Sequence, residues 1–175
     1  MDHQEFIKLY DENVTGIYRY ILIRVSSKEA AQDLTSEVFL RTWEYIGQSM
    51  AARETAVSIQ IKSPRAFFYR VAKNLVVDFY REKAKAPISL DELGVQIPDT
   101  ENNPAERTSL ALEMAPVQRA LAGLKDDYRD VIIWHYLDDL SVPEIADVLG
   151  KSEGAVRVML HRGLGSARQL IESGK

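Results

Sequence analysis

Apolar residues recur at three- and four-residue steps along most of the chain, and this spacing is the feature that most limits its fold. From Glu5 to Arg24 it marks one helical stripe, and a second helix is predicted for Lys28–Gly47. Pro64 suits a first helical turn, which predicts a third helix through Lys85. Alternation typical of a strand is confined to the short VSIQI segment. The sequence therefore predicts an all-α protein.

A segment without helical spacing divides the chain. Residues 86–107, APISLDELGVQIPDTENNPAER, contain three prolines and an Asn-Asn pair, which predicts a linker. Helical spacing then returns over roughly 108–123, 126–138, 142–149 and 153–172. We therefore predict two small helical domains, residues 1–85 and 108–175, joined by a linker longer than compact domains usually contain.

Composition and motifs argue against several classes of protein. The sequence contains no cysteine, which excludes disulfides, thiolate metal sites and a catalytic thiol. Its three histidines are scattered without metal-binding spacing, and no nucleophile elbow or phosphate-binding loop occurs. No apolar run reaches the roughly 18 residues of a membrane span, and the first residues are acidic where a secretory leader needs bases. We expect a cytoplasmic protein that is not an enzyme, has no membrane span and uses no cofactor or metal.

The segment SVPEIADVLGKSEGAVRVMLHRG, residues 141–163, is typical of a helix-turn-helix. Ser141 and Glu144 predict a capping box at the start of the first helix. Gly150 suits the left-handed residue that ends this helix, and Ser152 caps the next. The second helix of such a motif enters the major groove of DNA. From the pattern alone, an αα-hairpin in a core with solvated surface arginines is the alternative.

A second candidate nucleic-acid surface lies in SPRAFFYRVAKNLVVDFYREKAK, residues 63–85. Residues 62–85 hold seven Lys and Arg against two acidic residues. Single-stranded nucleic acid is bound by aromatic rings that stack on bases and by basic side chains that hold the backbone. The spacing predicts a buried seam of Phe67, Val71, Leu75 and Asp78-Phe79, and an outward face of Arg70, Lys73, Asn74 and Arg81. An aromatic stripe that only packs a core is the alternative.

Taken in order, these stretches resemble the bacterial RNA polymerase sigma factors, specifically the small extracytoplasmic-function (ECF) group of the sigma-70 family. AAQDLTSEVFLRTWEYI, residues 30–46, resembles the part of region 2 that docks on the polymerase clamp. Residues 63–85 resemble the helix that melts the promoter and recognises its −10 element. Residues 124–162 resemble region 4, which recognises the −35 element, and the acidic linker resembles the family's connector.

The resemblance implies roles for particular residues. Polymerase would be met by Asp33, Glu37 and Leu40, whereas Phe39 and Trp43 would pack in the core. The −10 strand would be bound by Phe67, Tyr69, Arg70, Lys73 and Asn74, with Asn74 lining a pocket for an extruded base. The −35 element would be bound by Arg157, His161 and Arg162, with Lys151 and Glu153 near the helix start. The implied partners are core RNA polymerase, promoter DNA and an anti-sigma factor.

Three features depart from the family's pattern. Val158-Met159 replaces a small polar residue followed by arginine, and Gly163 and Gly165 stand in a stretch that is usually basic. A glycine in a helix interior costs roughly 1 kcal/mol relative to alanine, so we expect the end of this helix to fray and −35 affinity to fall. The 47–63 connection is also longer than the family pattern suggests.

Two other functions stay open on the sequence. A stand-alone transcription regulator of LuxR type would use the helix-turn-helix but would give residues 30–46 and 63–85 no role. A sigma-like decoy would act only through protein partners, and the altered recognition helix is its support. The chain has 22 Lys+Arg against 26 Asp+Glu, a net charge of −4, so the isolated protein is expected to bind duplex DNA weakly.

Overall fold

The computed structural model describes residues 3–51, 63–85, 117 and 119–173, and the chain divides into two compact units, Met1–Pro98 and Asp99–Lys175. Within those ranges every regular element is helical, which confirms the predicted all-α fold. The linker predicted at 86–107 and most of the 47–63 connection lie outside the described residues.

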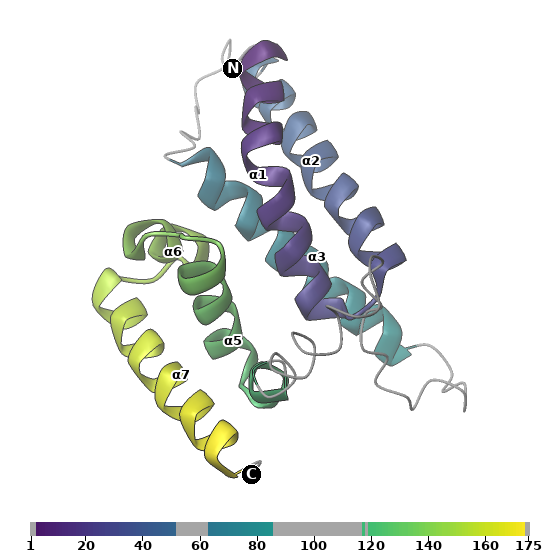
Figure 1. Cartoon of the computed structure of the whole chain (residues 1–175). Coiled ribbons are helices and arrows are strands. Elements are labelled where there is room, and N and C mark those ends of the chain that lie inside the picture. The colour runs from purple at the N-terminus through teal and green to yellow at the C-terminus, as the bar shows by residue number, and fades with distance from the viewer. Residues whose placement is uncertain (1–2, 52–62, 86–116, 118, 174–175) are drawn as a thin grey trace, which may run out of the picture. The chain divides into compact units, whose positions relative to one another are not determined.

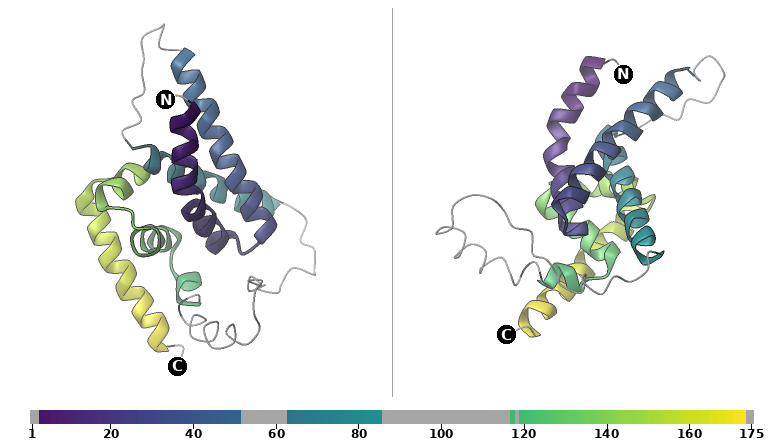
Figure 2. Two further views of the ribbon diagram at one scale, coloured as in Figure 1. Left: turned by 45° about the horizontal axis from the view of Figure 1, so that its top comes forward. Right: turned by 90° about the vertical axis from the view of Figure 1, so that its right-hand side faces the viewer.

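The described residues of the first unit form the helices α1 (His3–Val25), α2 (Lys28–Ala51) and α3 (Pro64–Lys85), at or near the predicted boundaries. Both α2 and α3 pack against α1 and against each other, and the three lie side by side in Figures 1 and 2. Serine caps explain where two of them begin. The Ala30 N–H donates to Ser27 Oγ at 3.3 Å, and the Ala66 N–H donates to Ser63 Oγ at 3.2 Å.

Aromatic rings fill the core of this unit. The Phe68 ring lies 4.8 Å from that of Phe39, and the Tyr69 ring lies 6.0 Å from that of Tyr20, with all four side chains buried. The seam predicted for α3 is right at Leu75 but wrong in phase elsewhere, since Phe67, Val71 and Phe79 are only half-buried and Asp78 is exposed. The buried residues of α3 are Ala66, Phe68, Tyr69, Ala72, Leu75 and Val76. Adjacent aromatic residues left two phases open, and the neighbours on α1 and α2 select one.

The second unit holds α5 (Asp126–Ile132), its π-helical continuation η3 (Ile133–Leu137), α6 (Val142–Leu149) and α7 (Glu153–Ser173). The sequence predicted a single helix over 126–138, whereas its last turn widens to the π form. Both α5 and α6 pack on α7 (Figure 1). The largest fully buried side chain of the unit is Trp134, which anchors this core.

An arginine ties the helical residues 119–123 to α5. The Arg129 guanidinium donates to the Leu121 carbonyl at 2.6 Å, to the Leu124 carbonyl at 3.1 Å, and also to the Ala122 carbonyl. Carbonyls at the C-terminal end of a helix have no partner within the helix, and a cation satisfies them well. Arg129 therefore has a structural role in joining these two segments.

Candidate nucleic-acid interface

The helix-turn-helix forms with the predicted caps. The Ser141 N–H donates to Glu144 Oε2 at 2.9 Å, and the Glu144 N–H donates to Ser141 Oγ at 3.4 Å, which completes the capping box. Gly150 has a φ of 62° and ends α6 in the left-handed conformation. The Ala155 N–H then donates to Ser152 Oγ at 3.2 Å and begins α7. These contacts fix the turn that orients α7.

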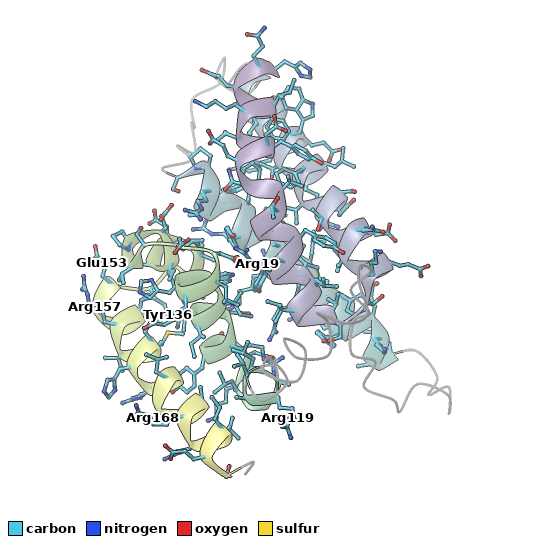
Figure 3. All side chains as sticks on the ribbon, in the orientation of Figure 1. Arg19, Arg119, Tyr136, Glu153, Arg157 and Arg168 are labelled. Atoms are coloured by element: carbon cyan, nitrogen blue, oxygen red, sulfur yellow. The ribbon has the colours of Figure 1, made fainter. Side chains whose placement is uncertain are left out.

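The outward face of α7 carries the side chains predicted for −35 recognition. Arg157, His161 and Arg162 are exposed, as are Lys151 and Glu153 near the helix start. Arg157 Nη2 lies 2.8 Å from Glu153 Oε2, one turn earlier, and Figure 3 shows both on the side of α7 away from α5. The opposite face buries Val156 and Leu160 against the rest of the unit. This arrangement leaves Arg157, His161 and Arg162 on the solvent-exposed face of α7.

The glycines of α7 do not interrupt it, contrary to the expected fraying, since the helix continues to Ser173. Gly163 is buried where α7 crosses α5. A Cβ placed there would lie 3.1 Å from Ile132 Cδ1 and 3.3 Å from Tyr128 Cβ. Gly163 thus permits the close approach of the two helices, while Gly165 faces open space, with nothing within 4 Å of an added Cβ. Helix packing therefore explains the departure from the family's pattern at Gly163.

The outward face of α3 carries part of the predicted −10 set. Arg70 and Asn74 are exposed, and Lys73 is half-buried at the edge of this face. Phe67 is half-buried and stacks on Tyr45 of α2, with ring centroids 4.9 Å apart. Tyr69 differs from the others, since it is only 1% exposed and lies in the core. Its burial leaves it no surface for a DNA strand in this conformation, so we leave it out of the interface.

The residues predicted to meet polymerase lie along one face of α2. Asp33 is exposed and Leu40 is 52% exposed. Glu37 is half-buried, and its Oε1 lies 2.6 Å from Arg41 Nε. Phe39 is buried as expected, but Trp43 is 38% exposed rather than part of the core. Its ring lies 4.9 Å from that of Phe6 at the edge of α1 and α2. The length of a tryptophan side chain lets it cover the core edge while one side stays open.

The remaining site features are few. His135 is half-buried, and its Nδ1 lies 2.9 Å from the Leu140 carbonyl oxygen. Among the described residues, no three His, Asp or Glu side chains group in a way that could hold a metal ion. None of the described helices is both long and apolar enough to cross a bilayer. The sequence marked Val158 only as a departure from the family's pattern, and the structure adds that its side chain is 47% exposed.

These two units define a class: a helical transcription factor with a basic-aromatic helix in one unit and a helix-turn-helix in the other. Family models match both units in order, "Sigma-70 region 2" over residues 9–86 and "Sigma-70, region 4" over residues 114–165. The chain belongs to the sigma-70 family, in its ECF group of RNA polymerase sigma factors. Sigma factors of this family direct transcription initiation at promoters.

Similar proteins support the assignment. The chain is 30% identical over 167 residues to the ECF RNA polymerase sigma factor BldN of Streptomyces coelicolor, covering 95% of this chain and 60% of BldN. It is 31% identical over 134 residues to the ECF sigma factor ShbA of Streptomyces griseus, covering 69% of this chain and 70% of ShbA. The fold resembles that of the sigma factor RpoE of Bartonella quintana, with a TM-score of 0.66, 19% identity, and coverage of 98% and 99% of the two chains.

Proposed function

We propose that this chain binds core RNA polymerase and directs promoter-specific initiation, recognising the −10 element through α3 and the −35 element through α7. The observation that carries the proposal is the presence of two outward helix faces with basic side chains, one in each unit, in the order of regions 2 and 4. A stand-alone regulator of LuxR type would use only α7. The outward faces of α2 and α3 would then have no function.

At the −10 element, α3 would hold a single strand. Arg70 and Lys73 supply charge for the phosphates, and Asn74 offers an amide that can hydrogen-bond the edge of a base. Extruding a base costs a few kcal/mol of pairing and stacking, so the positions of its partners have to be fixed in advance. The buried face of α3, packed on α1 and α2, supplies that rigidity.

At the −35 element, Arg157 would exchange its partner. In the free protein it pairs with Glu153, and both side chains are more than a third exposed. Such a surface pair contributes about 0.5 kcal/mol or less, so a DNA phosphate or guanine can replace Glu153 at little cost. Lys151, His161 and Arg162 complete the proposed contact surface.

Polymerase would be met by the α2 face of Asp33, Glu37 and Leu40. The large exposed fraction of Leu40 beside two carboxylates suits a partner surface with an apolar socket and basic rim. Docking on polymerase also reconciles the net charge of −4 with DNA recognition, because the larger enzyme would supply most of the nonspecific affinity. The protein would act in the cytoplasm, without a cofactor and without catalytic activity of its own.

An anti-sigma factor is a further proposed partner. The Bartonella RpoE structure holds that sigma factor in complex with the anti-sigma factor NepR. A protein that covered the α2 face or the outward face of α7 would block the contacts proposed above. Co-purification of the full chain from its native cells, with and without core polymerase present, would identify such a partner.

The decisive experiment is run-off transcription with purified core polymerase, the full chain and a randomised promoter library. We expect initiation only with both proteins present, and weak duplex binding by the chain alone at physiological salt. Asn74→Ala and Arg157→Ala should each lower initiation, by about tenfold for loss of a good base contact. Lys8→Ala, which removes an exposed lysine on α1, is the matched control and should change little.

Three outcomes would contradict the proposal. Tight promoter binding without polymerase would favour the stand-alone regulator. Polymerase binding without any initiation would favour the decoy. Full initiation by both Asn74→Ala and Arg157→Ala would remove these helices from promoter recognition.

A further inference from the structure

An apolar side chain stands in the middle of the cationic face of α7. Val158 is 47% exposed, and Arg157, which precedes it, is exposed as well, as are His161 and Arg162 one turn further along the helix. Met159, the next residue, is half-buried and turned toward the unit. One turn before Val158, an added Cβ on Gly154 would meet nothing within 4 Å, so the approach to Val158 is open.

The chemistry of valine limits what it can recognise. An exposed apolar side chain is common by itself. This one, however, has basic side chains around it, and these would bring a DNA backbone close. Valine has no donor or acceptor, so it cannot match the hydrogen-bonding edges of guanine, adenine or cytosine. The C5-methyl of thymine is the apolar group that a base presents in the major groove. A β-branched side chain in a helix is held in one main rotamer, so its two methyls keep a fixed position.

We propose that Val158 is a specificity-determining residue that contacts the C5-methyl group of a thymine in the −35 element. This inference rests on the proposed function of α7, and it adds which base is recognised at one position of the −35 element. Arg157, His161 and Arg162 hold the helix in the groove, while Val158 distinguishes thymine from the other bases by apolar contact. The replacement of the family's small polar residue is thereby a change of specificity rather than a loss of affinity.

The test removes the methyl group alone. The holoenzyme of core polymerase and full chain first selects bound fragments from a duplex library randomised at the −35 region. Each thymine of the selected −35 element is then replaced singly by deoxyuridine, which keeps the hydrogen-bonding edge, and binding of the holoenzyme is measured by competition. We expect one thymine at which this replacement weakens binding about fourfold, as loss of one buried methyl-sized group would.

Variants at Val158 assign that effect. Val158→Ala should bind thymine and uracil at that position equally, and Val158→Thr, which keeps a γ-methyl, should retain part of the preference. Leu164→Ala is the matched control, because Leu164 is 44% exposed on the same helix but lies about 9 Å further along its axis. It should keep the full preference. Both positions are on the surface, and circular dichroism would confirm that each of the three variants folds.

Each contrary result is informative. A selected −35 element without thymine, equal binding of thymine and uracil at every position, or an unchanged preference in Val158→Ala would overturn the inference. If the holoenzyme still initiates from selected promoters in those cases, the proposed function stands and only the role of Val158 falls. If no holoenzyme forms or initiates, the proposed function itself fails.

Discussion

The two units of this protein reach stability in different ways. The first has long helices, of 23, 24 and 22 residues, whose core is filled with aromatic rings. The second unit combines the 21-residue α7 with two short helices, α5 of 7 residues and α6 of 8, and relies on a capping box, a left-handed glycine and the close helix crossing at Gly163. Long helices gain enough from packing to tolerate imperfect ends, whereas a short helix depends on its caps.

The difference matches the proposed tasks. A helix that holds a melted strand has to keep its position while the strand tends to pair and stack again. The buried residues along one face of α3 fix that position. A helix that enters a groove needs only a defined exit angle from its turn, which the caps at Ser141, Gly150 and Ser152 supply. Each unit holds one of the chain's two tryptophans, Trp43 and Trp134, so a background with the other tryptophan replaced by phenylalanine reports the unfolding of one unit.

The largest expected effect lies in the aromatic core. Phe68→Ala removes a fully buried ring that contacts the rings of Phe39 and Phe6, and should lower the free energy of unfolding of the first unit by about 3–5 kcal/mol. Urea unfolding followed by Trp43 fluorescence measures this change. The Trp134 transition should stay in place. An equal shift of both transitions would show that the two units do not unfold independently.

A cap removal tests the dependence of the short helices. Ser141→Ala breaks the capping box of α6 and should destabilise the second unit by about 1 kcal/mol. Ser63→Ala removes the cap bond at the start of 22-residue α3, and should cost the first unit about half as much. Thermal or urea unfolding of the two variants gives both values. A larger loss of stability in Ser63→Ala than in Ser141→Ala would show that the long helix depends more on its cap than the short one does.

The two glycines of α7 should respond with opposite sign. Gly163→Ala places a Cβ against Tyr128 Cβ, which is fixed to the backbone of α5, and should cost about 1 kcal/mol after its gain in helix propensity. Gly165→Ala adds a methyl in open space and should stabilise the unit by about 0.5–1 kcal/mol. Unfolding followed by Trp134 fluorescence distinguishes them. A stabilising Gly163→Ala would mean that α5 yields at this crossing.

The smallest expected effect concerns the ion pair of α7. Glu153→Gln removes the partner of Arg157, and should change the stability of the second unit by less than about 0.5 kcal/mol because both side chains are exposed. It should at the same time raise holoenzyme affinity for −35 DNA, since Arg157 no longer has to leave a carboxylate. A marked loss of stability would indicate that this ion pair stabilises the first turns of α7.

Local signals in the sequence predicted most of the second unit. The serine caps, Gly150 and the apolar steps of α6 and α7 act within about one helical turn, so neighbouring residues in the chain are enough to specify them. The outward positions of Arg157, His161 and Arg162 followed directly from the same spacing. The boundaries of α3 were likewise predictable, from Pro64 and the end of the apolar pattern at Lys85.

Other features depended on partners far along the chain. The residues alone could not tell which of Phe67 and Phe68 is buried, because both lie in an aromatic run, and contacts with Phe39 and Phe6 settle the phase of α3. The same packing buries Tyr69 and leaves Trp43 at the surface. The sequence suggested only that Gly163 weakens α7, whereas the crossing with α5 shows that a side chain there would crowd α5. The sequence by itself thus determined helix ends and the helix-turn-helix, since these depend on bonds within a few residues. Only the tertiary structure decided which faces are buried, since burial is a property of two surfaces that meet.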